Sequence, residues 1–131
     1  MLACALLAVV VAHAPAQVRG DFDHDGKPDV AEFVAGAQGS YWLVVRRGGP
    51  GHTVSLIATF TREELPNLYV TTAKPGRWST WCGKGGGSDT EPCPRKFVQL
   101  RGETLDFGMK ESTESVAIWN GKRFEVVLLS D

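Results

Sequence analysis

The sequence lacks an excess of charge, a long apolar run and the motif of a reaction centre. Its 14 basic and 15 acidic residues leave a net charge of −1, which gives no electrostatic reason to bind nucleic acid or an anionic membrane. The longest apolar run, residues 2–12, is about half of the roughly 20 residues that a membrane-spanning helix needs. No serine lies in a G-x-S-x-G motif. We therefore expect a protein without a membrane span, without a nucleic-acid partner and without enzymatic activity.

The N-terminus carries the features of an export signal. The first sixteen residues contain one apolar run and end in Ala14-Pro15-Ala16, the small-x-small pattern that precedes signal-peptidase cleavage, although they lack the positively charged start of such signals. Cleavage after this pattern leaves a mature chain that begins at Gln17. Cys4 follows a weak lipobox, but it precedes the apolar stretch, so a lipid anchor is the weaker interpretation. We expect a signal peptide at 1–16 and a protein exported to the periplasm or the extracellular space.

Cysteine is also scarce, with three residues in the whole chain. Once Cys4 leaves with the signal, Cys82 and Cys93 remain as an even pair in an oxidising compartment. A zinc site is the alternative, but the mature chain has no C-x-x-C spacing, and only His24 and His52 are left as further ligands. We predict a disulfide between Cys82 and Cys93, which stabilises the fold by roughly 3 kcal/mol in the chain-entropy model.

Residues 17–131 have a length that suits one compact domain, and their apolar residues alternate with polar ones. Alternation is typical of half-buried strands, and no segment sustains the i, i+3, i+4 spacing of an amphipathic helix. The strands predicted in this way cover residues 41–45, 54–60, 68–72, 77–81, 97–101, 105–109, 115–119 and 123–129. The expected fold is mainly β, a single small domain with a twisted antiparallel sheet or partial barrel and little helix.

Glycine and proline mark the predicted turns. Residues 48–51 contain three glycines that permit positive φ, which predicts a hairpin between the first two of these strands. Asn120-Gly121 is a type I′ signal within a final meander over 97–129. Residues 61–64 resemble a capping box on one helical turn, which the proline that follows would end. The glycine-rich segment 83–92, closed by the two cysteines, is expected to be flexible.

One short segment carries a ligand pattern. Residues 21–32, DFDHDGKPDVAE, match D-x-D-x-D-G-x5-E. A chain that wraps around a hard cation turns alternate side chains inward, a glycine makes the sharp turn, and a backbone carbonyl adds an oxygen, which together favour Ca²⁺ over Mg²⁺. The candidate ligands are Asp21, Asp23, Asp25, the Lys27 carbonyl, Asp29 and Glu32. The alternative is a solvated acidic turn, although ordinary turn chemistry does not require this alternation.

The residues around this loop argue against an EF-hand. After cleavage only residues 17–20 precede the loop, which leaves no room for the entering helix. Pro28 lacks the backbone N–H that paired EF-hand loops use, and it biases Lys27 toward extended geometry. We therefore expect the loop to lead into a strand, or one short helical turn, at 30–35.

The segment GDFDHDGKPDVAEFV resembles the calcium loop of FG-GAP or VCBS repeats. The resemblance implies that calcium is bound by the residues that match the repeat, which are Asp21, Asp23, Asp25, Asp29 and the carbonyl of Lys27. Glu32 has no required counterpart in that family, so its role as a ligand stays open. His24 stands where the repeat usually has glycine, and its side chain is expected to face solvent. A single copy cannot form a propeller, because a propeller needs several blades.

The sequence thus predicts a non-enzymatic calcium-binding module of the periplasm or cell surface. Four tryptophans are many for this length, although a tryptophan in a small sheet usually belongs to the core. If Trp78 and Trp81 are exposed together, they offer a face for a glycan or a protein ligand. A second hypothesis is a secreted inhibitor of a cell-wall hydrolase, for which residues 83–92 would supply the protruding loop.

Overall fold

The structure, a computed structural model, describes residues 16–131 and is mainly β. The predicted signal peptide lies, except for its last residue, outside the described residues. Within residues 16–131 no helix is long and apolar enough to cross a membrane, and the helical elements are the short 3-10 helices η1 (Ala37–Gly39), η2 (Leu65–Asn67) and η3 (Cys82–Lys84). The strands are β1 (Gln17–Gly20), β2 (Asp29–Ala35), β3 (Tyr41–Arg46), β4 (Val54–Phe60), β5 (Leu68–Ala73), β6 (Gly76–Ser79), β7 (Phe97–Leu100), β8 (Thr104–Met109), β9 (Thr113–Trp119) and β10 (Phe124–Ser130).

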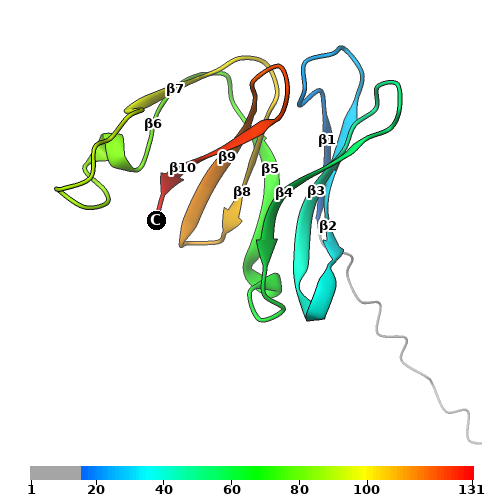
Figure 1. Ribbon diagram of the computed structural model, residues 1–131, viewed down its shortest axis with the longest axis horizontal. Coiled ribbons are helices and arrows are strands. Elements are labelled where there is room, and N and C mark those ends of the chain that lie inside the picture. Colours follow the sequence, from blue (N-terminus) through cyan, green and yellow to red (C-terminus); the bar gives the residue numbers. More distant parts are fainter. Residues whose placement is uncertain (1–15) are drawn as a thin grey trace, which may run out of the picture.

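Eight of these strands form two antiparallel sheets of four, in the orders β1-β2-β3-β4 and β10-β9-β8-β5 (Figure 1). The sheets pack face to face as a sandwich. At its two sides β1 comes near β5 and β4 comes near β10, but the described strands form no ladder across either side, so the barrel is not closed. The predicted antiparallel β fold with little helix is confirmed, as is the hairpin between β3 and β4.

The main core lies between the two sheets and uses one face of each. Leu43 and Val45 of β3 point into it from one side, and Leu105 and Phe107 of β8 point into it from the other. Residues two apart share a face of a strand, which explains why the alternation in the sequence located these strands. Phe22, from the acidic loop between β1 and β2, is 1% exposed and belongs to the same core. The loop is thereby anchored to the sandwich by a core residue.

A third layer, made of β6 and β7, covers the other face of the β10-β9-β8-β5 sheet. Val98 and Leu100 of β7 pack there against Ala73 and Val116 in a second core. The predicted meander over 97–129 is therefore wrong in its first strand, because β7 pairs with β6 while β8 pairs with β5. The alternation within β7 fits either partner. β7 pairs with β6 instead of β8 because the two strands together bury the apolar outer face of the β10-β9-β8-β5 sheet.

The predicted disulfide between Cys82 and Cys93 is confirmed, with the two Cα atoms 5.6 Å apart. It closes the connection between β6 and β7. Part of this connection is closely packed rather than free. A Cβ on Gly83 would lie 2.1 Å from a backbone carbonyl oxygen, and a Cβ on Gly86 would lie 2.1 Å from the ring of Trp81. The expectation of a flexible segment is corrected for these two glycines, because they allow close packing.

Two predicted turns differ in detail from the structure. Between β9 and β10, Gly121 has a φ of 99° but Asn120 is not in the left-handed region, so the turn is not type I′. The Asn120 side-chain oxygen instead accepts the N–H groups of Lys122 and Arg123, each at 2.9 Å. At residues 61–64, where a capped helical turn was predicted, the Thr61 N–H donates to Glu64 Oε1 at 2.9 Å, but Pro66 does not end the helical structure, because it lies inside η2. A proline fits there because the first turn of a helix does not need its N–H.

Asp106 is a buried carboxyl group on the face of β8 that points away from the main core. It is 6% exposed, and the Tyr69 hydroxyl donates a 3.0 Å hydrogen bond to it. Burial and the negative charge of Glu114 raise the pKa of Asp106 to about 7, although the hydrogen bond from Tyr69 acts in the opposite direction. Burial and the neighbouring Asp106 also raise the pKa of the Tyr69 hydroxyl. Asp106 therefore titrates near neutral pH.

The substitution Asp106→Asn is expected to stabilise the protein increasingly as pH rises from 4 to 8. The pKa of Asp106 in the folded protein lies above its unfolded value of 3.8. At a pH between these two pKa values, the Asp106 carboxyl of the folded protein holds a proton that the unfolded chain has lost. Wild-type stability therefore falls as pH rises through this window, whereas a carboxamide does not titrate. The difference between the two proteins should grow by about 4 kcal/mol across this range, because each unit of pKa difference contributes about 1.4 kcal/mol, as measured by urea unfolding at pH 4, 6 and 8. The exposed Glu111→Gln is the control, and a pH-independent difference for Asp106→Asn would contradict the prediction.

Candidate metal site

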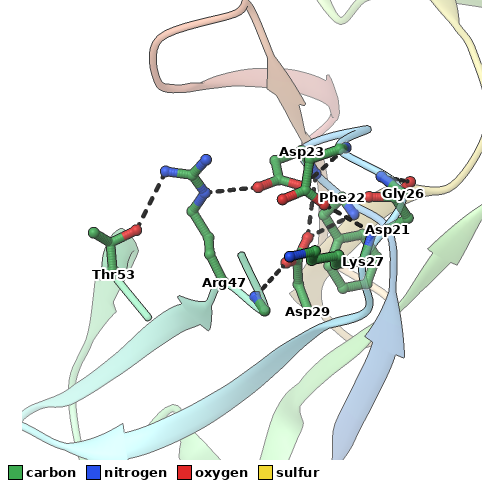
Figure 2. Close-up of polar contacts among 10 residues, drawn as sticks. Asp21, Phe22, Asp23, Gly26, Lys27, Asp29, Arg47 and Thr53 are labelled. Atoms are coloured by element: carbon green, nitrogen blue, oxygen red, sulfur yellow. Dashed lines mark hydrogen bonds and ion pairs between the residues drawn. The ribbon is translucent and has the colours of Figure 1, made fainter. Parts of the chain in front are cut away.

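The metal loop, residues 21–28, joins β1 to β2 as the connection of an antiparallel hairpin (Figure 2). β1 occupies the residues where an EF-hand would have its entering helix. The chain leaves the loop through β2, which begins at Asp29, one residue before the predicted strand at 30–35. Gly26 has a φ of 86°, in the left-handed region that a glycine adopts without strain. The predicted ion-binding sequence is thus built into a β-hairpin.

Three of the predicted ligands come together in the structure. Asp21, Asp23 and Asp29 each offer one carboxylate oxygen, and these oxygens lie within 4.8 Å of one another. Asp23 and Asp29 are buried, and Asp21 is half-buried. Carboxylates at this distance repel one another strongly when they are shielded from water. The three residues, hereafter the aspartate cluster, could hold a metal ion.

Asp29 ties the metal loop to its surroundings. It is 0% exposed, and its Oδ2 accepts the N–H groups of Phe22 at 2.9 Å and of Asp23 at 3.2 Å. Its Oδ1 accepts the Gly48 N–H at 2.9 Å, from the connection between β3 and β4. Burial raises the pKa of Asp29, and the hydrogen bonds from Gly48 and Asp23 oppose this shift. One carboxylate therefore joins two loops that are far apart in the sequence.

Asp23 is the member of the cluster that contacts an arginine. Its Oδ2 accepts a 2.7 Å hydrogen bond from Arg47 Nε, and its Oδ1 accepts the Asp25 N–H at 3.3 Å (Figure 2). Burial acts to raise the pKa of Asp23, but hydrogen bonds from Arg47 and Asp25, together with the charge of Arg47, hold it below its usual value. Asp23 is therefore negatively charged at neutral pH, as a metal ligand must be.

Asp21 shows whether a cation fits the cluster. Its Oδ2 accepts the Gly26 N–H at 2.9 Å. Its Oδ1 is buried and has no hydrogen-bond partner in the part of the chain that the structure describes. A buried carboxylate oxygen without a partner is costly, and coordination of a cation shared with Asp23 and Asp29 would remove that cost. The residues of the cluster therefore fit a hard cation that prefers oxygen ligands.

The other predicted ligands are placed differently. Asp25 is exposed, and its Oδ1 accepts the Lys27 N–H at 2.8 Å. Glu32 forms an ion pair with Arg46, with 2.6 Å between Oε1 and Nε. Asp29 and Glu32 are three residues apart, which would put them on one face of a helix but puts them on opposite faces of a strand. Because the loop continues as β2, the structure does not bring Glu32 to the aspartate cluster.

Three residues outside the loop complete the site and were not predicted. They are Arg47, Gly48 and Glu103, whose carboxylate accepts the Asp21 N–H. A Cβ on Gly48 would lie 2.1 Å from the Pro28 carbonyl oxygen, so a glycine is needed for the β3–β4 connection to approach the metal loop. The glycine pair after Arg47 is the one sequence signal for this contact, and it indicates a turn as readily as a close approach.

His24 stands at a strained position, and His24→Gly is expected to raise the free energy of unfolding. Its φ of 57° lies in the left-handed region, where a residue with a Cβ is disfavoured by about 1 kcal/mol or more. Glycine removes that strain but has a more flexible unfolded state, so the expected gain is about 0.5 to 1 kcal/mol. Urea unfolding measures the gain. His24→Ala is the matched control, since it removes the ring but keeps the Cβ, and an equal gain there would contradict the explanation.

Comparisons with known proteins add no family to this geometry. No family model, no curated protein and no solved structure matches the chain. The resemblance of residues 20–34 to an FG-GAP or VCBS loop therefore rests on those residues and stays a prediction. The function has to be argued from the chemistry of the site.

Proposed function

We propose that the chain is a non-enzymatic calcium-binding protein, exported to the periplasm or cell surface, in which the ion stabilises the metal loop against the sandwich. The observation that carries the proposal is the buried Oδ1 of Asp21, which has no hydrogen-bond partner among residues 16–131 and belongs to a carboxylate that clusters with those of Asp23 and Asp29. A bound calcium ion would satisfy this oxygen and offset the repulsion within the cluster. The loop and the sandwich would then be stabilised together, because Phe22 belongs to both.

Calcium suits this donor set better than the alternatives. The candidate ligands are all oxygens, which soft metals disfavour. Calcium accepts six to eight oxygens in flexible geometry, whereas magnesium requires a near-ideal octahedron. The aspartate cluster supplies three side chains, and the Asp25 carboxylate and the Lys27 carbonyl, on the exposed part of the loop, could join water in completing the shell. The affinity expected of such an extracellular module is on the order of 10⁻⁴ to 10⁻³ M.

Export is supported by two independent features. The leader has the apolar core and, at Ala14-Pro15-Ala16, the small-x-small cleavage pattern of a signal peptide. The disulfide between Cys82 and Cys93 fits an oxidising compartment, where such bonds form and persist.

Calorimetric titration of the purified protein with CaCl₂ tests the proposal. The wild-type protein should bind calcium, and Asp21→Asn should weaken binding at least about tenfold, because it replaces a charged ligand by a neutral one of the same shape. Asp89→Asn removes the same charge from an exposed position in the segment between the cysteines and should leave binding unchanged. Absence of calcium binding to the wild type, or binding that Asp21→Asn leaves unchanged, would overturn the proposal.

A ligand face at Trp78 and Trp81 receives less support from the structure than the metal site does. Both rings are half-buried. Trp78 packs against the second core and its indole N–H donates to the Lys74 carbonyl at 3.0 Å, while Trp81 lies against Gly86. A glycan or protein ligand at these residues stays a prediction, as does the alternative function of inhibiting a cell-wall hydrolase through the loop at 83–92.

A further inference from the structure

Arg47, directly after β3, links three parts of the molecule that are separate in the sequence. Its Nε donates to Asp23 Oδ2 at 2.7 Å, and its NH1 group donates to Thr53 Oγ1 at 3.2 Å in the connection to β4 (Figure 2). On the other side its guanidinium carbon lies 4.5 Å from the ring centroid of Trp119, in the opposite sheet. The guanidinium therefore lies between the metal loop and an aromatic ring of β9.

The neighbouring Arg46 is also paired with a carboxylate, but it lies on the other face of the sheet and is more exposed than Arg47. Successive residues of a strand point to opposite sides, and Arg46 pairs with Glu32 on the outer face, where its side chain is 54% exposed. The side chain of Arg47 is 28% exposed, and that of Asp23 is fully buried. Water screens the Arg47–Asp23 pair less than the Arg46–Glu32 pair, so its charge acts more strongly on its surroundings.

We propose that Arg47 is an internal counter-charge that competes with a divalent cation for Asp23 and sets the affinity of the aspartate cluster. The inference rests on the proposed function. A cation on the cluster lies close to a fixed positive charge, and it must share or take over a carboxylate that the guanidinium already neutralises. The cation and the Arg47 guanidinium therefore weaken each other's contact with Asp23 by the same factor, as linkage requires. Cation binding therefore loosens the Arg47–Asp23 contact and changes the environment of Trp119.

This competition has a measurable consequence for affinity. Arg47→Gln removes the charge but keeps a polar side chain that can reach toward Asp23 or Thr53. One charge near a divalent ion at partly shielded sites changes the binding constant by about tenfold. Calcium should therefore bind Arg47→Gln about tenfold more tightly than it binds the wild type. Arg46→Gln, which makes the same change in net charge one residue away, should bind within about twofold of the wild type.

Calorimetric titration with CaCl₂ of the wild type, Arg47→Gln and Arg46→Gln tests the affinity, with far-UV circular dichroism to confirm folding. Binding to Arg47→Gln that equals or falls below that of the wild type overturns the competition while leaving calcium binding intact. Absence of binding to the wild type overturns the proposed function itself. If Arg47→Gln does not fold, the tryptophan emission of the wild type and of Trp119→Phe replaces it. A calcium-induced change that Trp119→Phe abolishes supports the inference, and a change that persists, or none, overturns it.

Discussion

Asp29→Ala is expected to lower the free energy of unfolding by about 3 kcal/mol and to abolish the calcium binding that we propose. The substitution leaves the buried N–H groups of Phe22 and Asp23 and the partly buried N–H of Gly48 without their acceptor. Each unpaired buried donor costs about 1 to 3 kcal/mol. The cost of burying the carboxylate itself, which raises its pKa, offsets part of this sum, so the expected loss lies at the lower end.

Urea unfolding at pH 7, with and without CaCl₂, measures this loss. Asp25→Ala is the matched control, because it removes the same charge from the same loop at an exposed position whose side chain accepts one N–H, that of Lys27. We expect Asp25→Ala to cost less than about 1 kcal/mol. Equal losses for the two variants would contradict the role assigned to the hydrogen bonds that Asp29 accepts.

Removal of the disulfide by Cys82→Ala with Cys93→Ala is expected to cost about 3 kcal/mol. The bond closes a short ring, with a sequence separation of 11, and the chain-entropy model gives a loss of this size for such a ring. The ring lies within the β6–β7 layer, which joins the sandwich through a second, smaller core. The destabilisation should therefore be greatest in that layer, including the residues around Trp81.

Hydrogen exchange followed by mass spectrometry locates the effect, and urea unfolding gives its size. Amides of residues 76–100 should exchange faster in the double variant, while amides of β2 and β3 should keep most of their protection. The wild-type protein under reducing conditions serves as the second test, since it loses the bond without a change of sequence. Uniform loss of protection across both sheets would contradict the local role of the disulfide.

The sequence was sufficient for most of the strands, though not for β1, because burial imposes a period of two. Leu105 and Phe107, or Leu43 and Val45, alternate with residues of the opposite face, and this pattern locates a strand without any knowledge of its neighbours. The alternation does not show which other strand pairs with it. β7 was assigned to the wrong sheet for this reason, since Val98 and Leu100 alternate equally well in any antiparallel pair.

For the site too, the residues close together in the sequence were predictable and those brought in by the fold were not. The spacing of Asp21, Asp23 and Asp29 was readable because a chain that wraps around an ion uses residues near in sequence. Arg47 reaches the loop through the order of β1, β2 and β3 in the sheet, which a motif does not encode. Whether Glu32 could be a ligand depended on the element that follows the loop, because only a helix would bring its side chain to the same face as Asp29.

Phe22 gives the metal loop a consequence for how the protein unfolds. It lies between two aspartates of the loop in sequence and is 1% exposed in the main core. The loop cannot detach without withdrawing a phenylalanine from between the sheets, which costs several kcal/mol. Most surface loops melt before the domain that carries them. Here the loop and the sandwich should instead come apart in one cooperative transition, so an ion held by the loop would raise the stability of the whole sandwich.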